Sequence, residues 1–148
     1  MRIDTLKIGE TNKVAAFLRE IDPSLFDGLP LDSGALMAEV TKARRDHYWG
    51  IWDGSVLHTV FFLRGLDAGY VTPAFGVAVA PAAQRRGLGH LALVFAETWS
   101  RWAGLKEIML TVSDGNKRAI TIYEKYGFIR TSERSAKGNL IYRKSIRE

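Results

Sequence analysis

The sequence predicts an α/β fold within one domain that spans residues 1–148. Two observations lead to this prediction. The apolar residues change period several times along the chain, from the alternation typical of strands to the spacing of amphipathic helices. Turn residues, chiefly glycine, aspartate and asparagine, separate these segments. The expected order is strand, helix, helix, three strands, helix, strand, helix and two strands, which makes about seven strands.

Each expected element follows from a local pattern. The predicted strands are 1–8, 47–52, 55–63, 70–80, 107–112, 128–131 and 140–144, and the predicted helices begin at Thr11, Ser33, Leu88 and Asn116. Asp53-Gly54 lies between two β-rich runs and is a strong hairpin signal. The segment from Leu88 contains one early glycine and no proline, so we expect a mostly buried helix that ends at Gly104. The side chains expected to be buried or half-buried include Ile3, Leu6, Ile8, Trp49, Trp52, Trp99 and Trp102.

Composition excludes several classes of protein. The chain has 47% hydrophobic and 25% charged residues, which is close to the globular average. It has no cysteine, so disulfides, thiol nucleophiles and cysteine-based zinc sites are excluded, and with three histidines we expect no metal site. No segment approaches the ~18 apolar residues of a membrane span, and the N-terminus lacks an apolar signal region. We expect a cytoplasmic protein with no membrane partner.

The net charge of +5 favours an anionic partner. Basic residues are nevertheless spread along the chain, with modest density at Lys42, Arg44 and Arg45 and again at Arg143, Lys144 and Arg147. No helix-turn-helix, zinc-finger or RNA-recognition motif accompanies them. We therefore expect a small anionic ligand and no nucleic acid.

The segment GLGHLA fits the G-x-G-x-x-A pattern of dinucleotide-binding loops, but its context does not. In that motif the first glycine follows a strand directly, and an acidic residue about 20 positions later binds the ribose. Here residues 81–86 separate the strand from Gly87, and Glu107 opens the next strand instead of ending it. A Gly-Lys-Ser/Thr sequence is also missing, which argues against a P-loop.

A different motif fits the same loop. Gln84, Gly87 and Gly89 in QRRGLG follow the strand that ends in VAVAP, and this arrangement resembles the acyl-coenzyme A motif of the GNAT N-acetyltransferase superfamily. Physically, such a loop directs backbone N–H groups and a helix N-terminus toward one anion. A second segment, NKRAITIYEKYGF, resembles the N-x-x-A-x-x-x-Y-x-x-x-G-F motif of that family. The matching residues are Asn116, Ala119, Tyr123, Gly127 and Phe128.

The resemblance implies a fold and a reaction. The fold would be a mixed, mostly antiparallel central sheet of about seven strands with helices on both faces, in which the strands 75–80 and 107–112 splay apart around pantetheine. The reaction would transfer an acetyl group from acetyl-CoA, as cosubstrate, to a primary amine by direct attack on the thioester and without a metal. Tyr123 would protonate the departing thiolate, and the N–H of Val77 would stabilise the oxyanion. The implied coenzyme-binding residues are Val77, Ala78, Val79, Gln84, Arg85, Arg86, Gly87, Leu88, Gly89, His90 and Asn116.

The chain departs from the family pattern at the general base, because FGVAVA contains no carboxylate. His58, Asp114 and Glu97 remain candidates, as does an amine that arrives neutral or loses its proton to water. The missing carboxylate also leaves open an alternative function, a non-catalytic acyl-CoA-binding sensor.

The amine acceptor, a small molecule or a peptide, is not determined by the sequence. Loops would select it, and their carboxylates Asp27, Asp32 and Asp67 could attract a cationic amine. The sequence leaves both a monomer and a homodimer open.

Overall fold

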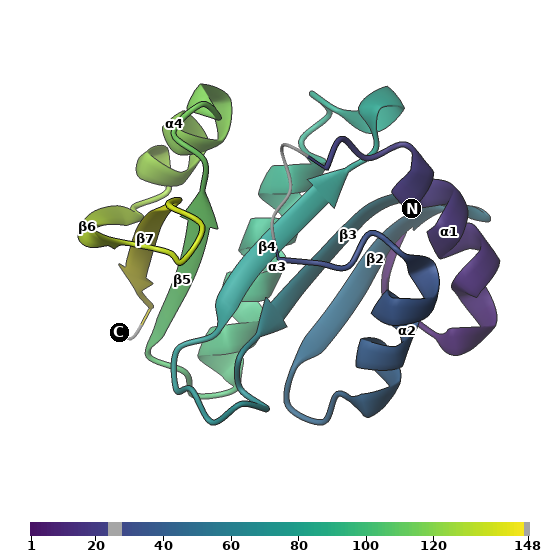
Figure 1. The fold of residues 1–148 in the computed structure, drawn as a ribbon, viewed down its shortest axis with the longest axis horizontal. Coiled ribbons are helices and arrows are strands. Elements are labelled where there is room, and N and C mark those ends of the chain that lie inside the picture. Colours follow the sequence, from purple (N-terminus) through teal and green to yellow (C-terminus); the bar gives the residue numbers. More distant parts are fainter. Residues whose placement is uncertain (24–27, 147–148) are drawn as a thin grey trace.

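One seven-stranded sheet forms the centre of the computed structural model, which describes residues 1–23 and 28–146 (Figure 1). The strands are β1 (Arg2–Thr5), β2 (His47–Asp53), β3 (Val56–Arg64), β4 (Ala74–Val79), β5 (Glu107–Val112), β6 (Ile129–Arg134) and β7 (Leu140–Ser145). The helices are α1 (Thr11–Arg19), α2 (Ser33–Lys42), α3 (Leu88–Trp102) and α4 (Lys117–Lys125). The strand order is β1-β2-β3-β4-β5-β7-β6, and every neighbouring pair except β4 and β5 is antiparallel. The predicted fold class is confirmed.

Helices cover both faces of the sheet, because successive side chains of each strand point to opposite faces. On β3, Val60 and Phe62 join a core cluster with α1 and α2. The residues between and beyond them, Phe61 and Leu63, join the second cluster, which contains the buried side of α3. Figure 1 shows α1 and α2 on one side of the sheet and α3 on the other. None of the helices within the described residues has the length and apolarity needed to cross a bilayer.

The sheet divides between its two parallel strands. β4 and β5 share a single residue pair, Ala74 with Met109, and the N–H of Met109 donates to the carbonyl of Pro73 at 3.0 Å. Beyond that point the strands diverge, as Figure 1 shows. Each is held along its outer edge, β4 by β3 and β5 by β7. The backbone on the inner edges therefore faces a gap between two firmly paired halves.

Some local expectations are wrong. Ile8 is 68% exposed, because β1 ends at Thr5 and Ile8 begins a short 3-10 turn. Trp102 is 86% exposed, whereas Ser100 is fully buried, because side chains two positions apart on a helix point to different sides. The strand expected from Tyr70 begins at Ala74, since the N–H of Tyr70 donates to Gly65 and closes a turn.

Candidate active site

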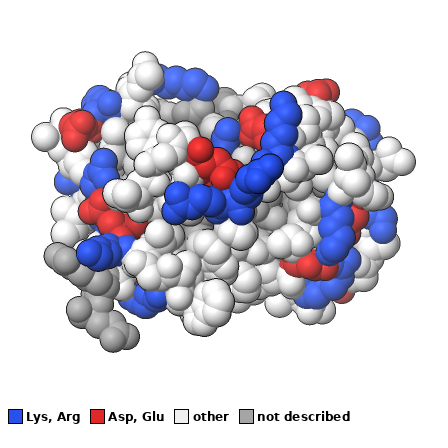
Figure 2. Space-filling model, turned by 90° about the horizontal axis from the view of Figure 1, so that it is seen from below, with Lys and Arg blue, Asp and Glu red and all other residues white. Residues whose placement is uncertain are grey.

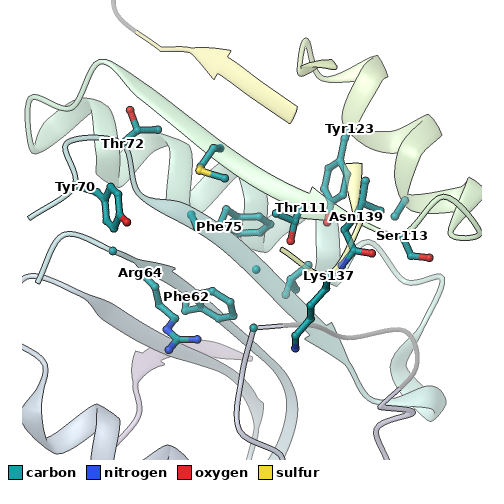
Figure 3. Close-up of a pocket in the computed structure, with 18 of the residues that line it drawn as sticks. Phe62, Arg64, Tyr70, Thr72, Phe75, Thr111, Ser113, Tyr123, Lys137 and Asn139 are labelled. Carbon is teal, nitrogen blue, oxygen red and sulfur yellow. The ribbon is translucent and has the colours of Figure 1, made fainter. Parts of the chain in front are cut away.

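Two cavities open on the gap between β4 and β5. We call the first the loop cavity; it has a volume of about 380 Å³ and lies between the 81–90 segment and the start of α4. The second, the sheet cavity, measures about 740 Å³ and is bordered by β3, β4, β5 and residues 137–139 (Figure 3). The residues that line both cavities are Val77, Asn116, Ala119 and Tyr123. Ligands held in the two cavities would meet at this junction.

The inner edge of β4 presents backbone groups to the gap. The carbonyl of Pro73 accepts a hydrogen bond from β5. The N–H of Ala80 instead donates to the carbonyl of His58, near the start of β3, at 2.9 Å. Backbone groups of successive strand residues point to alternate edges, so Val77 and Val79 face the gap and Ala78 faces β3. The Nε2 atom of Gln84 donates to the carbonyl of Val79 at 3.3 Å, which agrees with this alternation. Ala78 therefore borders the loop cavity with its side chain, not with its backbone N–H or C=O.

The loop before α3 forms a site suited to an anion. Arg85 and Gly87 both adopt left-handed backbone, with φ of 64° and 86°, and Gly87 is the N-cap residue of α3. Glycine has no side chain that could cap the helix, so the N–H groups of the first turn are left for a ligand. The positive end of the helix dipole adds to their attraction for an anion. Bulk is also low here, because a Cβ at Gly87 would meet nothing within 4 Å.

Most of the residues expected to bind the coenzyme line the loop cavity. Those that do are Val77, Ala78, Val79, Gln84, Arg85, Gly87, Leu88, Gly89, His90 and Asn116. Arg86 belongs to the same loop and is exposed, but it is not among the lining residues. The cavity is completed by Glu20, Ile21 and Asp22 after α1, which the sequence patterns did not indicate.

Tyr123 lies at the junction of the two cavities, on helix α4, whose first turn is held by a side-chain cap. The side chain of Asn116 accepts the N–H of Ala119 at 3.3 Å and caps the helix. The Tyr123 ring packs edge-on against Phe128, with 5.9 Å between centroids, and Figure 3 shows it pointing from α4 into the sheet cavity. Burial raises the pKa of Tyr123 to about 12. No hydrogen bond joins its hydroxyl to any residue in the described parts of the chain.

His90 and Tyr126 connect the two halves of the split sheet. His90 lies in the first turn of α3, and Tyr126 follows α4. Their rings stack with centroids 4.4 Å apart, and the Tyr126 hydroxyl lies 3.4 Å from Nε2 of His90. His90 also lines the loop cavity, so this contact holds one of the cavity's lining side chains in place.

The carboxylates expected on the acceptor side have structural partners. Asp32 caps α2 by accepting the N–H of Ala35 at 2.8 Å. Asp67 accepts backbone N–H groups from Arg45 at 2.7 Å, Arg44 at 3.0 Å and Asp46 at 3.2 Å. These bonds lower the pKa of Asp67. Asp27 lies outside the described residues.

None of the three candidate bases lines either cavity. Glu97 pairs with Arg101 and with Lys144, both at 2.6 Å. Asp114 pairs with Arg134 at 2.6 Å, which lowers the pKa of Asp114. His58 lies near the opposite end of β3 from the residues that border the sheet cavity, Phe62 and Arg64. Because His58 lines neither cavity, it does not face the junction.

No sequence motif predicted the residues that form the wall of the sheet cavity. The outer end of the Phe62 ring lies against Gly76 of the neighbouring strand, and a Cβ at Gly76 would overlap it. The guanidinium of Arg64 lies over the same ring, 5.6 Å from its centroid. A glycine inside a β-rich run was the available signal, since it often indicates a close approach by another group. The sequence does not indicate that the approaching group is the Phe62 ring.

Surface charge and metal ligands complete the description. On the face seen in Figure 2, basic side chains lie beside acidic ones and do not form a patch of one sign. Among the residues that the structure describes, no group of three or more histidines and carboxylates could hold a metal ion.

Comparison with known proteins identifies the family. The model of the acetyltransferase (GNAT) family matches residues 15–128. The chain belongs to this family. A stretch of 65 residues is 38% identical to mycothiol acetyltransferase from Mycobacteroides abscessus and covers 44% of this chain and 22% of that protein. The chain thus matches only about a fifth of the length of this curated relative.

Solved structures of GNAT relatives share the fold. The PaiA N-acetyltransferase of Thermoplasma acidophilum, in complex with coenzyme A, superposes with a TM-score of 0.80 over 97% of this chain and 98% of that chain, at 18% identity. The ribosomal-protein-S18-alanine N-acetyltransferase of Escherichia coli gives a TM-score of 0.76 over 98% and 93%, at 17% identity. Identities this low show a common fold only.

Proposed function

We propose that this GNAT protein transfers an acetyl group from acetyl-CoA to a primary amine, within a single domain of residues 1–148 and in the cytoplasm. The observation that carries the proposal is the Tyr123 hydroxyl, which stands at the junction of two cavities without a protein partner among the described residues. A coenzyme in one cavity and an amine in the other would meet beside this hydroxyl.

The loop cavity is the proposed coenzyme site. The pyrophosphate would lie against the backbone from Arg85 to His90, where the first turn of α3 offers N–H donors. Pantetheine would follow the inner edge of β4 and bond the backbone of Val77 and Val79. Gln84 positions this loop by donating to Val79, and the exposed Arg86 adds positive charge outside the cavity. Asn116 and the side chain of Ala78 would complete the walls.

The proposed reaction is direct attack. The nitrogen lone pair of the neutral amine forms a C–N bond with the thioester carbonyl, and the N–H of Val77 stabilises the resulting oxyanion. As the tetrahedral intermediate collapses, the C–S bond breaks and the sulfur leaves with the electron pair. The Tyr123 hydroxyl donates a hydrogen bond to this sulfur, and the proton lost by the nitrogen converts the thiolate into the thiol. The products are an amide and the coenzyme A thiol.

The pKa values suit this role. With a pKa of about 12, Tyr123 stays protonated at physiological pH and can donate a hydrogen bond from its hydroxyl. A free thiol has a pKa near 8.5, so the thiolate is more stable than the phenolate. Donation from Tyr123 therefore acts mainly as a hydrogen bond to the departing sulfur, and the nitrogen supplies the net proton. No described carboxylate lines the junction, so the amine would lose its first proton to water.

The same missing carboxylate favours a second candidate, a sensor that binds acyl-CoA without turnover. The two functions separate in one experiment that measures acetyl-CoA binding by calorimetry and coenzyme A release across a panel of amines. Turnover on any amine supports the enzyme. Tight binding with no turnover on every amine supports the sensor, and the absence of binding refutes both.

The acceptor is proposed to be a small molecule or a peptide. Both kinds are represented among fold neighbours, since one is named for spermidine and another for an alanine of a ribosomal protein. These names describe those proteins. The walls of the sheet cavity give a more specific indication.

A further inference from the structure

The charged side chains on the walls of the sheet cavity are mostly cationic. Among the described lining residues, Arg64 and Lys137 are basic and Asp46 is the carboxylate. Asp46 accepts the N–H of Asp67 at 3.0 Å, so it is engaged in joining two loops. Asp67 and Asp32, which the sequence suggested for a cationic acceptor, bind backbone N–H groups. A polyamine, which brings several positive charges, would meet the Arg64 guanidinium at this wall.

Arg64 is held in a defined position. Its Nη2 atom pairs with Glu39 at 3.1 Å, and Glu39 also accepts a hydrogen bond from the Tyr48 hydroxyl at 3.3 Å. Its guanidinium rests on the face of Phe62, which in turn covers Gly76. Figure 3 shows Arg64 and Lys137 reaching the same side of the cavity. Two sides of the guanidinium are thus fixed before any ligand arrives.

Pairing with Glu39 does not exhaust this side chain. A guanidinium has five N–H donors in a planar fork, and the ion pair with Glu39 is made through one of its nitrogens. The Arg64 side chain remains 30% exposed while lining the cavity. A carboxylate or phosphate oxygen can therefore approach the remaining donors. Stacking on Phe62 reduces the conformational entropy that binding would otherwise cost.

We infer that Arg64 selects an acceptor in which the reacting amine and an oxyanion group, a carboxylate or a phosphate, belong to one small molecule. This inference rests on the proposed acetyl transfer. Arg64 pairs with Ala74, and Val77 lies three residues further along β4, about 10 Å at the usual strand rise. A chain of several carbon atoms between amine and oxyanion covers a span of this length.

The test uses acceptors of equal length and different charge. Coenzyme A release is measured with ε-aminocaproate, hexylamine and hexamethylenediamine, which end in a carboxylate, a methyl group and a second ammonium. Aminohexyl phosphate forms a further arm that separates phosphate from carboxylate recognition. We expect kcat/KM to be at least about tenfold higher for an oxyanion-bearing acceptor than for hexylamine, and lowest for the diamine.

Variants of the wild-type chain connect this preference with Arg64. Arg64→Met should remove the preference by raising KM for the anionic acceptor more than it raises KM for hexylamine. Arg64→Lys should retain part of the preference, because the charge remains but the fork is lost. Glu39→Gln replaces the ion pair of Arg64 with a neutral hydrogen bond and should keep the preference. Arg130→Met, on the exposed outer strand β6, is the control for an equal change of net charge.

The outcomes distinguish a failure of this inference from a failure of the proposed acetyl transfer. Equal or better use of hexylamine or the diamine by the wild-type protein overturns the inference and leaves acetyl transfer intact. A preference that survives Arg64→Met overturns the role of Arg64. Turnover on none of the four amines overturns the inference about the acceptor, and turnover on no member of the broader amine panel by a protein that binds acetyl-CoA overturns the proposed transferase.

Discussion

Replacing Tyr123 with phenylalanine removes one hydroxyl from the junction of the two cavities. The hydroxyl has no hydrogen bond within the described residues, and the ring would keep its edge contact with Phe128. The free energy of unfolding should therefore change by less than about 0.5 kcal/mol. Acetyl-CoA affinity should stay within about twofold, because the proposed phosphate and amide contacts lie elsewhere.

The effect on kcat should be much larger. A hydrogen bond to a charged group contributes about 1.5–3 kcal/mol, and the sulfur becomes charged only as the C–S bond breaks. At about 1.4 kcal/mol per tenfold in rate, we expect kcat of Tyr123→Phe to fall about 10- to 100-fold. Because the pKa of Tyr123 is about 12, the wild-type rate should also show no descending limb as the pH rises to 10.

Three measurements test this reasoning: coenzyme A release under saturating substrates, calorimetric titration with acetyl-CoA, and urea unfolding. Tyr142→Phe is a matched control, since its hydroxyl donates to Glu124 at 2.8 Å and lines neither cavity. That control should lower stability by about 1 kcal/mol and leave kcat unchanged. A kcat of Tyr123→Phe within twofold of the wild type would remove the hydroxyl from the mechanism.

Three further predictions concern the walls of the site and the pH dependence of stability. Gly76→Ala should displace the Phe62 ring, lower the free energy of unfolding by about 1–3 kcal/mol in urea and raise KM for the acceptor; unchanged values would show that the ring moves freely. His90→Ala should weaken acetyl-CoA binding about three- to tenfold by calorimetry, whereas Tyr126→Phe, which keeps the stacked rings, should change it less than twofold; equal effects would contradict a role for stacking. Burial raises the pKa of Tyr48 from 10.0 to about 12, so the folded protein keeps a proton that the unfolded chain loses: stability should be complete below pH 10 and decline toward pH 12, less steeply in Tyr48→Phe, and parallel urea curves would refute this.

The elements with strong local patterns were predicted well. The strand 107–112 has the bounds of β5, and α3 ends before Gly104, which adopts the left-handed backbone that stops a helix. The loop before α3 could also be predicted from the sequence, because its motif is contiguous and its shape depends on the backbone freedom of Gly87. A helix followed by its cap, or a loop followed by a helix, is decided by neighbours along the chain.

The residues of the sheet cavity could not be predicted from the sequence in this way. Phe62, Arg64, Gly76 and Lys137 come from separate segments and meet because β3 pairs with β4 while β4 and β5 diverge. The same limit explains the error at Trp102, whose apolar character suggested burial although its side chain is exposed while that of Ser100, two positions earlier, is buried. Burial depends on what else packs nearby, and that is a property of the folded chain.

The sequence by itself determined the family, the order of the elements and the loop that is suited to an anion, because each depends on residues that are adjacent or one helical turn apart. Tertiary structure decided that Asp67 binds backbone N–H groups instead of facing a ligand, and that Arg64 lines the cavity beyond Tyr123. The physical reason is that strand pairing across long loops sets which side chains share a cavity. No local pattern in the chain records that pairing.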